Sequence, residues 1–458
     1  MMELREKSVL VLGLGETGLS LVRWLGAQGA RLRVADSRSN PPGLDKVAQH
    51  VAPTEIHCGP FADTLLQGID FIAISPGVPV AEPLVQRALK RHIPVVGDIE
   101  LFAQALPRAQ RPKIIAITGA NGKTTVTTMV GAMCRAAGLD TEVAGNISPA
   151  VLDVLLQREG RQPQAWVLEL SSFQLETTSS LNADAATVLN VTEDHLDRYS
   201  GMDAYAAAKA RIFMGCGVRV LNRDDERSNV MSPAGSACVK FGLGAPYRNE
   251  DWSIERDGAD IWLVQGQRRV LNAGELQVAG LHNIANALAA LALCRAIELP
   301  LEPLCAALRS FKGLPHRMEK IAELNGVTYY DDSKGTNVGA TEAALKGLGK
   351  PAVVILGGDG KGQDFSPLKQ AVAEHARAAV LIGRDAAKIE AALQGCAKPV
   401  VRASDLADAV RQGTALAQPG DAVLLSPACA SFDMFRNYQH RAEVFVAAVH
   451  DLQQGAAC

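Results

Sequence analysis

Short apolar runs alternate with segments of helical periodicity along almost the whole chain. The runs have the length of β-strands, and the segments between them place apolar residues three and four positions apart, as helices do. This alternation predicts an α/β fold in which helices cover mostly parallel sheets. The runs expected to form strands cover residues 9–12, 32–35, 71–74, 94–96, 166–168, 187–189, 327–330, 353–356, 380–382 and 422–425, and an Ala- and Leu-rich helix is expected near residues 283–295.

Two polar stretches divide this pattern into three units. Residues 105–113 are polar, basic and contain prolines, and residues 311–317 lie between a helix-like segment and a new set of strands. The chain of 458 residues is also too long for one compact core. We therefore predict three α/β domains: a Rossmann-like domain over residues 1–105, a central P-loop ATPase-like domain over 106–312 and a second Rossmann-like domain over 313–458.

Composition and charge exclude several classes of protein. Apolar residues make up 48% of the chain and charged residues 21%, as in folded soluble proteins. The net charge of −3 argues against a nucleic-acid partner. The nine cysteines are never spaced Cys-x-x-Cys, which indicates reduced thiols and neither a disulfide framework nor a zinc site. The charged N-terminus leads directly into a strand and no apolar run approaches the roughly 20 residues of a membrane span, so we expect a cytoplasmic protein without membrane insertion.

The most informative motif follows the apolar run that opens the central unit. A Gly-rich turn, Gly119-Ala-Asn-Gly122, is followed by Lys123, Thr124 and Thr125 at the start of a helix-like segment. Backbone N–H groups of such a turn bind phosphate oxygens, the lysine adds a positive charge, and the first threonine hydroxyl can reach Mg²⁺. Two residues separate the glycines where the general phosphate loop has four, so this is a shortened variant. The alternative is an ordinary turn between strand and helix.

A second Gly-rich loop, residues 13–18, follows the first predicted strand and opens a helix. Asp36 ends the next strand, so the segment fits a dinucleotide-binding fingerprint. The pyrophosphate of a UDP-sugar fits the same loop equally well. Ser37 and Arg38, directly after the strand, can meet a ribose, a uracil or a phosphate. The alternative is a tight turn without a ligand.

Polar residues follow two strands of the central unit. Glu169 ends an apolar strand beside the phosphate loop, where a magnesium ligand would lie. His195 lies in an acidic loop after another strand and is either a metal or substrate contact or a structural residue. From its helical surroundings Lys209 is interpreted as a solvated lysine. Asn286 is either an amide at the edge of the core or a contact to an adenine base.

The last unit has three polar loops, residues 330–337, 357–361 and 426–432, each directly after a predicted strand. Loops that follow parallel strands meet at one edge of the sheet, so together they suggest a site for an anionic substrate, with Lys334 and Lys361 as its cations. Unrelated surface turns are the alternative. Arg317, at the break before this unit, can reach a bound phosphate when the domains close.

In their order along the chain these motifs resemble the Mur ligases, the ATP-dependent amide-forming enzymes of peptidoglycan precursor synthesis. The matching segments are residues 13–18, 118–124, 169–173, 190–197, 314–319, 332–337, 357–361 and 425–431. The central motifs are common to the family. The two outer domains resemble those of the member that adds D-glutamate, because Asp332-Ser-Lys-Gly-Thr-Asn337 and Ser426-Pro-Ala-Cys-Ala-Ser431 stand where relatives that add other amino acids have different patterns.

The resemblance implies a reaction in which UDP-N-acetylmuramoyl-L-alanine is activated by ATP as an acyl phosphate and then joined to D-glutamate, giving ADP and phosphate. The cofactors are then ATP and Mg²⁺, the catalysis requires domain closure, and a monomer is expected. Lys209 matches a lysine that is carbamylated in the family, which reverses its interpretation as a solvated residue. Catalytic roles fall on Lys123, Glu169, His195 and Lys209.

The resemblance also assigns binding roles by position. The residues implied in ATP binding are Gly119, Asn121, Gly122, Lys123, Thr124, Thr125, Asn286, Arg317 and Asp332. The implied contacts to the UDP-linked substrate are Thr17, Ser37, Arg38, Gly145, Asn146 and His195. The implied D-glutamate pocket consists of Lys334, Thr336, Lys361, Ser431, Phe432 and Tyr438. The implied magnesium ligands are Thr124, Glu169, His195 and carbamylated Lys209. Ser37, Phe432 and Tyr438 differ in residue type from common versions of the family but keep the chemical role.

Three other functions compete with this one. A folate-type glutamate ligase shares the ATP site but lacks the N-terminal sheet domain. An NAD(P)-dependent oxidoreductase would leave the phosphate loop and Arg317 without a role. A non-catalytic nucleotide switch would leave the polar loops of the last unit unexplained.

Overall fold

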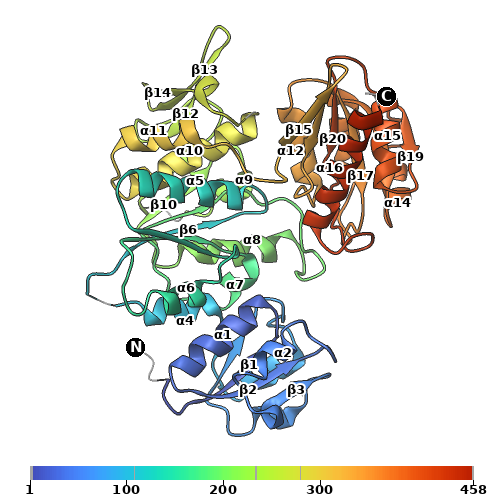
Figure 1. Ribbon diagram of the computed structural model, residues 1–458. Coiled ribbons are helices and arrows are strands. Elements are labelled where there is room, and N and C mark those ends of the chain that lie inside the picture. The colour runs from blue at the N-terminus through green and yellow to red at the C-terminus, as the bar shows by residue number, and fades with distance from the viewer. Residues whose placement is uncertain (1–3, 108, 233–234, 279, 456–458) are drawn as a thin grey trace.

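In the computed structural model, three α/β units follow one another along the chain (Figure 1). The structure describes residues 4–107, 109–232, 235–278 and 280–455. The blue N-terminal unit and the orange-to-red C-terminal unit lie on different sides of the central unit. Each unit has its own mostly parallel sheet, so the predicted three-domain α/β architecture is confirmed.

The N-terminal sheet is entirely parallel, with the strand order β3-β2-β1-β4-β5. The strands are β1 (Ser8–Leu12), β2 (Arg31–Asp36), β3 (Ile56–Cys58), β4 (Phe71–Ile74) and β5 (Val95–Val96), and the helices are α1 (Glu16–Ala27), α2 (Leu44–Val47) and α3 (Pro83–Lys90). The order reverses between β1 and β4, and ligands of open α/β sheets bind at such a point. The four predicted strands are confirmed. The partly exposed β3 carries no apolar run and was not predicted.

The central sheet has nine strands in the order β14-β13-β12-β11-β10-β9-β6-β8-β7. The strands are β6 (Lys113–Thr118), β7 (Thr141–Gly145), β8 (Ala165–Glu169), β9 (Ala185–Val188), β10 (Val218–Asn222), β11 (Cys238–Phe241), β12 (Trp252–Asp257), β13 (Asp260–Gln265) and β14 (Arg268–Asn272). The helices are α4 (Asp98–Ala105), α5 (Lys123–Ala136), α6 (Val151–Gln157), α7 (Ser172–Glu176), α8 (Met202–Ala210), α9 (Glu226–Asn229), α10 (Leu281–Ala296) and α11 (Leu301–Ser310). The predicted strands β8 and β9 and the predicted helix α10 are present.

Helices cover both faces of this sheet. α5, α10 and α11 lie on one face, and Figure 1 shows α4, α6 and α7 on the other, toward the N-terminal domain. The first face buries Ile115, Val126 and Leu288, and the second buries Trp166 and Leu168. Burial on both faces explains the continuous apolar runs of β6 and β8.

Strands β12, β13 and β14 are antiparallel to one another and extend one end of the central sheet. The expectation of strand and helix alternation is wrong here. Tight turns at Gly258 and Gly266, both with positive φ, join the strands directly, so no helix covers the connections. Charged residues in this stretch fit a sheet that is exposed on one face.

The C-terminal sheet has the order β15-β16-β20-β17-β18-β19, and only β15 is antiparallel. The strands are β15 (Glu319–Leu324), β16 (Val327–Asp331), β17 (Ala352–Gly357), β18 (Ala376–Ile382), β19 (Val400–Arg402) and β20 (Ala422–Leu425). The helices are α12 (Val338–Gly347), α13 (Leu368–His375), α14 (Ala386–Ala392), α15 (Leu406–Leu416) and α16 (Tyr438–Gly455). The four strands predicted for this unit are present.

The contacts of helix α4 indicate where the boundary between the first two domains lies. The ring of Phe102 lies 4.9 Å from that of Trp166 in β8, and Asp98 accepts a hydrogen bond of 2.9 Å from Gln174 in α7. Because α4 packs on the central sheet, we propose that the central domain begins near residue 98, ahead of the predicted limit at 106. The predicted break at 105–113 includes Arg108, which lies outside the described residues. The limit at 312/313 stays a prediction.

Within the described ranges, no helix is both long and apolar enough to cross a membrane. The eight cysteines in those ranges are free thiols, as expected from their spacing. The ninth, Cys458, lies outside them.

Candidate active site

The phosphate loop joins the end of β6 to the start of α5. Gly119 and Gly122 both have positive φ, +159° and +83°. A Cβ on Gly122 would lie 2.7 Å from Oδ1 of Asn286, and one on Gly119 would lie 3.0 Å from Leu189. Both glycines are therefore required by the path of the backbone and by the close packing around it. The N-terminus of α5 carries no side-chain cap, which leaves its N–H groups directed at the loop.

Two lysines converge on this loop. Nζ of Lys123 donates hydrogen bonds to the carbonyls of Gly119 and Ala120, at 2.8 and 2.9 Å. Nζ of Lys209, from α8, donates to the same Gly119 carbonyl at 2.9 Å and lies 4.5 Å from the ring centre of Tyr205. Lys209 is only 2% exposed, so its interpretation as a solvated helix lysine is wrong. Burial, helped by the charge of Lys123, lowers the pKa of Lys209 well below its ordinary value.

Glu169 lies at the end of β8, beside this loop, and is 2% exposed. Its Oε1 accepts a hydrogen bond of 2.9 Å from Nδ2 of Asn146. Its Oε2 is buried and accepts no hydrogen bond from the described part of the chain. A buried carboxylate oxygen without a donor is costly unless a cation lies against it. A carboxylate oxygen in this position therefore fits as a ligand of a hard cation such as Mg²⁺.

His195 lies in the loop between β9 and α8, with a φ of +58° that is unusual for this residue type. Its ring packs 4.8 Å from that of Phe173, and its Nε2 lies 3.6 Å from a carboxylate oxygen of Asp194. Burial lowers the pKa of His195, and the nearby lysines lower it further, against the opposite effect of Asp194. A neutral imidazole can bind a metal or accept a hydrogen bond from a substrate.

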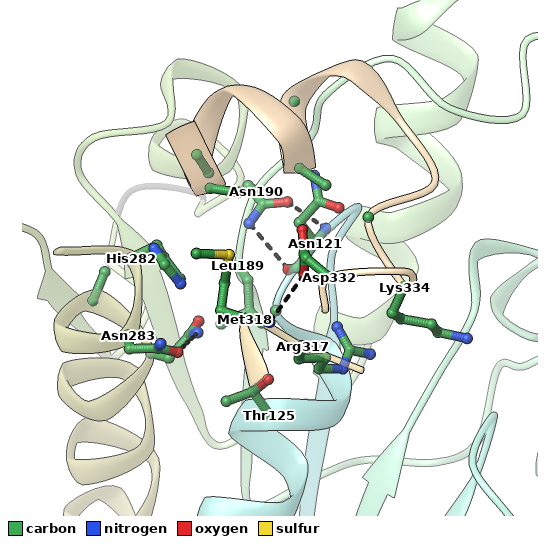
Figure 2. Close-up of a pocket in the computed structure, with 18 of the residues that line it drawn as sticks. Asn121, Thr125, Leu189, Asn190, His282, Asn283, Arg317, Met318, Asp332 and Lys334 are labelled. Carbon is green, nitrogen blue, oxygen red and sulfur yellow. Dashed lines mark hydrogen bonds between the residues drawn. The ribbon is translucent and has the colours of Figure 1, made fainter. Parts of the chain in front are cut away.

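A cavity of about 280 Å³ lies between the phosphate loop, α10 and the C-terminal domain (Figure 2). Apolar side chains of Leu189, Phe241 and Met318 line it together with amides of Asn190 and Asn286. Apolar walls with a few amides suit a purine base.

His282 also lines this cavity. Burial lowers its pKa to about 4, so the ring is neutral at physiological pH. Its Nδ1 has no hydrogen-bond partner among the residues that the structure describes. This nitrogen is covered by protein atoms near Gly280 and Gly347, so the cavity meets other atoms of the ring.

The C-terminal domain contacts the phosphate loop directly. Nη2 of Arg317 donates to Oγ1 of Thr124 at 2.7 Å. The side-chain amides of Asn121 and Asn337 exchange hydrogen bonds of 3.2 and 3.1 Å across the same junction. Lys361 extends toward the central domain, where its Nζ lies 3.6 Å from Oδ1 of Asp194. Arg317 thus lies beside the phosphate loop, and its contact with a bound phosphate stays a prediction.

Asp332 is buried beside Arg317 (Figure 2). Its oxygens accept hydrogen bonds from Oγ of Ser426 at 2.7 Å and from the backbone N–H of Met318 at 3.3 Å. Burial raises the pKa of Asp332 to about 7, although these bonds and the charge of Arg317 oppose the shift.

The predicted anionic pocket is only partly assembled. Nζ of Lys334 lies 3.9 Å from the ring centre of Tyr438, and burial lowers the pKa of this lysine to about 8. Thr336 follows in the same loop, and Ser431 is buried at the end of a neighbouring loop. The ring of Phe432 is 74% exposed, so it is not gathered with the others.

The N-terminal residues lie at the carboxyl edge of the first sheet. Thr17 is in the first turn of α1, and Ser37 and Arg38 are exposed after β2. Both carboxylate oxygens of Asp36 are engaged within the protein and not directed at a ribose. They accept hydrogen bonds from the N–H of Leu14, at 2.7 Å, and from the Arg38 guanidinium. Burial opposes its ionisation, but these bonds outweigh burial and lower the pKa of Asp36 to about 2.

Gly145 and Asn146, at the end of β7 in the central sheet, contact Glu169. Gly145 has a φ of +115°, and a Cβ there would lie 2.2 Å from the carbonyl oxygen of Glu169. Asn146 donates both its N–H, at 2.7 Å, and its amide, at 2.9 Å, to Glu169. These residues therefore hold the carboxylate in place.

Family models match the three units of the chain in order. Residues 7–97 match a Mur ligase MurD-like N-terminal domain, residues 117–294 a Mur ligase middle domain, and residues 316–429 a Mur ligase glutamate ligase domain. The chain belongs to the Mur ligase family. The resemblance inferred from the motifs is thus confirmed.

Among curated relatives of this Mur ligase, one from Nitrosospira multiformis is 59% identical, and the match covers 100% of this chain and 98% of the relative. One from Nitrosomonas europaea is also 59% identical over 98% of this chain and 97% of the relative. Both bear the name UDP-N-acetylmuramoylalanine–D-glutamate ligase.

Solved structures of the family share the fold of this Mur ligase. A UDP-N-acetylmuramate-alanine ligase from Thermotoga maritima matches with a TM-score of 0.60 at 18% identity, over 97% of this chain and 99% of the other. A MurF from Acinetobacter baumannii matches with a TM-score of 0.61 at 20% identity, over 96% and 91%. At such identities the likeness concerns the fold alone.

Sequence reasoning did not single out several residues of this Mur ligase that the structure places at the site. These residues are Asn190, Asp194, His282 and Arg441. The burial of Arg441 is the least expected of these positions, because an arginine on a C-terminal helix is usually exposed to solvent. Arg441 is buried and donates to Oγ and the carbonyl of Ser333 and to the carbonyl of Cys429, which joins two loops of the anionic pocket.

Proposed function

We infer that this Mur ligase uses ATP to add D-glutamate to UDP-N-acetylmuramoyl-L-alanine during peptidoglycan precursor synthesis. The observation that carries this inference is the 59% identity, over essentially the full length, to relatives that bear the name of this activity. The geometry agrees, because the C-terminal loops that resemble those of the D-glutamate-adding member lie against the phosphate loop.

In the proposed reaction the carboxylate of the UDP-linked substrate attacks the γ-phosphate of ATP. The resulting acyl phosphate supplies the leaving group that a carboxylate lacks, and the D-glutamate amine then displaces phosphate. Two anions must approach each other in the first step, so positioning and charge neutralisation do most of the work. We propose Lys123 and Arg317 for that neutralisation, with Thr124 between them and the loop amides of Gly119, Asn121, Gly122 and Thr125 around the phosphates.

We place the adenine base in the cavity beside α10. Asn286 lies both on the wall of this cavity and against Gly122 of the phosphate loop, so it can align base and phosphates together. Asp332 lines the opposite wall, on the C-terminal domain. The assignment explains why closure of that domain is required for a complete nucleotide site.

We propose Thr124, Glu169, His195 and carbamylated Lys209 as magnesium ligands. The unpartnered Oε2 of Glu169 supports this assignment. The lowered pKa of Lys209 supports carbamylation, because only a neutral amine reacts with carbon dioxide, and the product is an anionic oxygen ligand. Bound magnesium would reduce the repulsion between the substrate carboxylate and the phosphates.

We propose that Thr17, Ser37, Arg38, Gly145, Asn146 and His195 contact the UDP-linked substrate. The proposed D-glutamate pocket is formed by Lys334, Thr336, Lys361, Ser431 and Tyr438, with the exposed Phe432 at its rim. The carboxylate of Asp194 lies 3.6 Å from Nζ of Lys361 and balances its charge. The protein is proposed to act as a cytoplasmic monomer, without a nucleic-acid partner or membrane insertion.

The direct test measures phosphate release from ATP and Mg²⁺ with UDP-N-acetylmuramoyl-L-alanine, with and without D-glutamate. L-Glutamate, L-alanine and meso-diaminopimelate serve as comparison amino acids. Turnover that depends on D-glutamate is expected. Turnover with another amino acid would overturn the pocket assignment, and no turnover with any of them would overturn the proposed function.

A further inference from the structure

Arg198 is a largely buried arginine, with a side chain 12% exposed, in the loop that carries His195. Its guanidinium donates to the carbonyl of Pro76 at 2.7 Å and to that of Val78 at 3.2 Å. Both acceptors belong to the N-terminal domain. The planar fork of arginine can satisfy two carbonyls at once, which a lysine cannot do in the same geometry.

The loop that Arg198 holds packs directly against the Gly-rich loop of the first domain. A Cβ on Gly13 would lie 2.9 Å from Cβ of Ser75 and 3.1 Å from Cγ2 of Val78. The two loops follow β1 and β4, the strands between which the sheet order reverses. Any shift of residues 75–78 is therefore transmitted to residues 13–18.

On its other side Arg198 contacts helix α7 and the loop that carries His195. Its guanidinium lies 4.0 Å from the ring centre of Phe173 in α7, and 3.6 Å from the carboxylate of Glu176 on the same helix. The ring of Phe173 packs at 4.8 Å from that of His195. The backbone N–H of Arg198 also donates to the carbonyl of His195 at 2.9 Å. Arg198 thus belongs to the turn that gives His195 its positive φ.

We propose that Arg198 is a positioning residue that fixes the N-terminal domain against the His195 loop and so aligns the two halves of the UDP-substrate site. The inference rests on the proposed assignment of that substrate to the N-terminal domain. The proposed role of Arg198 is indirect, because its guanidinium is occupied by contacts with the protein. Its loss leaves two carbonyls and the ring of Phe173 without their common partner.

The test compares Arg198→Ala with Arg211→Ala. Arg211 is a matched control because it also donates to two carbonyls, of Leu175 at 2.7 Å and Thr178 at 2.8 Å, but both lie within the central domain. Arg198→Ala is expected to raise the KM for UDP-N-acetylmuramoyl-L-alanine about tenfold or more, as the loss of charge-assisted hydrogen bonds predicts. The KM values for ATP and D-glutamate are expected to stay within about twofold, and Arg211→Ala is expected to leave the UDP-substrate KM unchanged.

Arg198→Lys keeps the charge and provides a second variant if the alanine variant does not fold. It is expected to give an intermediate rise, measured both as KM and as the dissociation constant of the UDP-substrate without ATP. An unchanged KM in this variant and in Arg198→Ala would overturn the inference. An equal rise for all three substrates, or the same rise in Arg211→Ala, would do so as well. If the unmodified protein shows no turnover, the proposed function fails independently of Arg198.

Discussion

The carboxyl group of Asp332 is expected to make the stability of the C-terminal domain fall as the pH rises toward neutrality. Burial raises its pKa from 3.8 to about 7 in the folded protein. Below pH 4 both folded and unfolded states are protonated, so there is no penalty. Between pH 4 and 7 the unfolded chain ionises while the folded protein holds its proton, so the folded state loses stability over this window.

The size of the effect follows from the shift. At 1.36 kcal/mol per pH unit, a rise from 3.8 to about 7 corresponds to about 4 kcal/mol in total, of which about 2–3 kcal/mol falls between pH 5 and pH 7. Asp332→Asn mimics the neutral acid, because its amide can donate to Oγ of Ser426 and its oxygen can accept from the N–H of Met318. The variant should therefore lack this pH dependence.

The assay is denaturant unfolding of the full-length protein and of Asp332→Asn at pH 5, 6, 7 and 8. The free energy of unfolding of the parent, relative to that of the variant, should fall by about 2–3 kcal/mol across this series. Asp36→Asn serves as a control, because the pKa of Asp36 is lowered to about 2 and its contribution should be constant from pH 5 to 8. A parent that gains stability relative to Asp332→Asn as the pH rises, or a constant difference, would refute the reasoning.

Three further outcomes are expected. Lys209→Ala should lower kcat at least about 100-fold, with partial recovery on adding short-chain carboxylic acids, whereas activity equal to that of the parent would remove Lys209 from the metal site. Lys361→Met should raise the KM for D-glutamate about tenfold or more and leave that for ATP nearly unchanged, and an unaltered D-glutamate KM would contradict its role. Gly145→Ala should lower the free energy of unfolding by about 2–4 kcal/mol, because φ is +115° and the new Cβ would lie 2.2 Å from a backbone oxygen. Gly138→Ala is the control, because φ there is +88° but the space around a new Cβ is open. A loss of unfolding free energy as large as that of Gly145→Ala would show that crowding at Glu169 is unimportant.

Local chemistry explains why many candidate site residues could be proposed from the sequence. A phosphate loop needs glycines, a lysine and a hydroxyl at fixed spacing, so the sequence alone is sufficient to propose this role for residues 119–125. The polar residues that end parallel strands, such as Glu169 and Asp332, must meet at the carboxyl edge of their sheets. The order of the motifs was sufficient to recognise the family.

Several side chains could not be assigned in this way, because their role depends on contacts between segments far apart in the chain. Lys209 and Arg441 occur in helical segments whose sequence is that of solvated helices, and only packing reveals that both are buried. The antiparallel strands β12 to β14 were not predicted. β12 and β14 carry charged residues, and although β13 contains the apolar run 261–264, no helical segment follows it as in the rest of the chain.

The sequence by itself determined the α/β class, the three-domain order, the phosphate loop and the family, because these depend on periodicity and on residue types at short spacing. Only the tertiary structure decided which side chains meet across domains. The contacts of Arg317 with Thr124, of Asn337 with Asn121 and of Arg198 with the loop after β4 each join residues separated by more than 100 positions. Such pairings follow from the way the domains pack, and no local pattern encodes them.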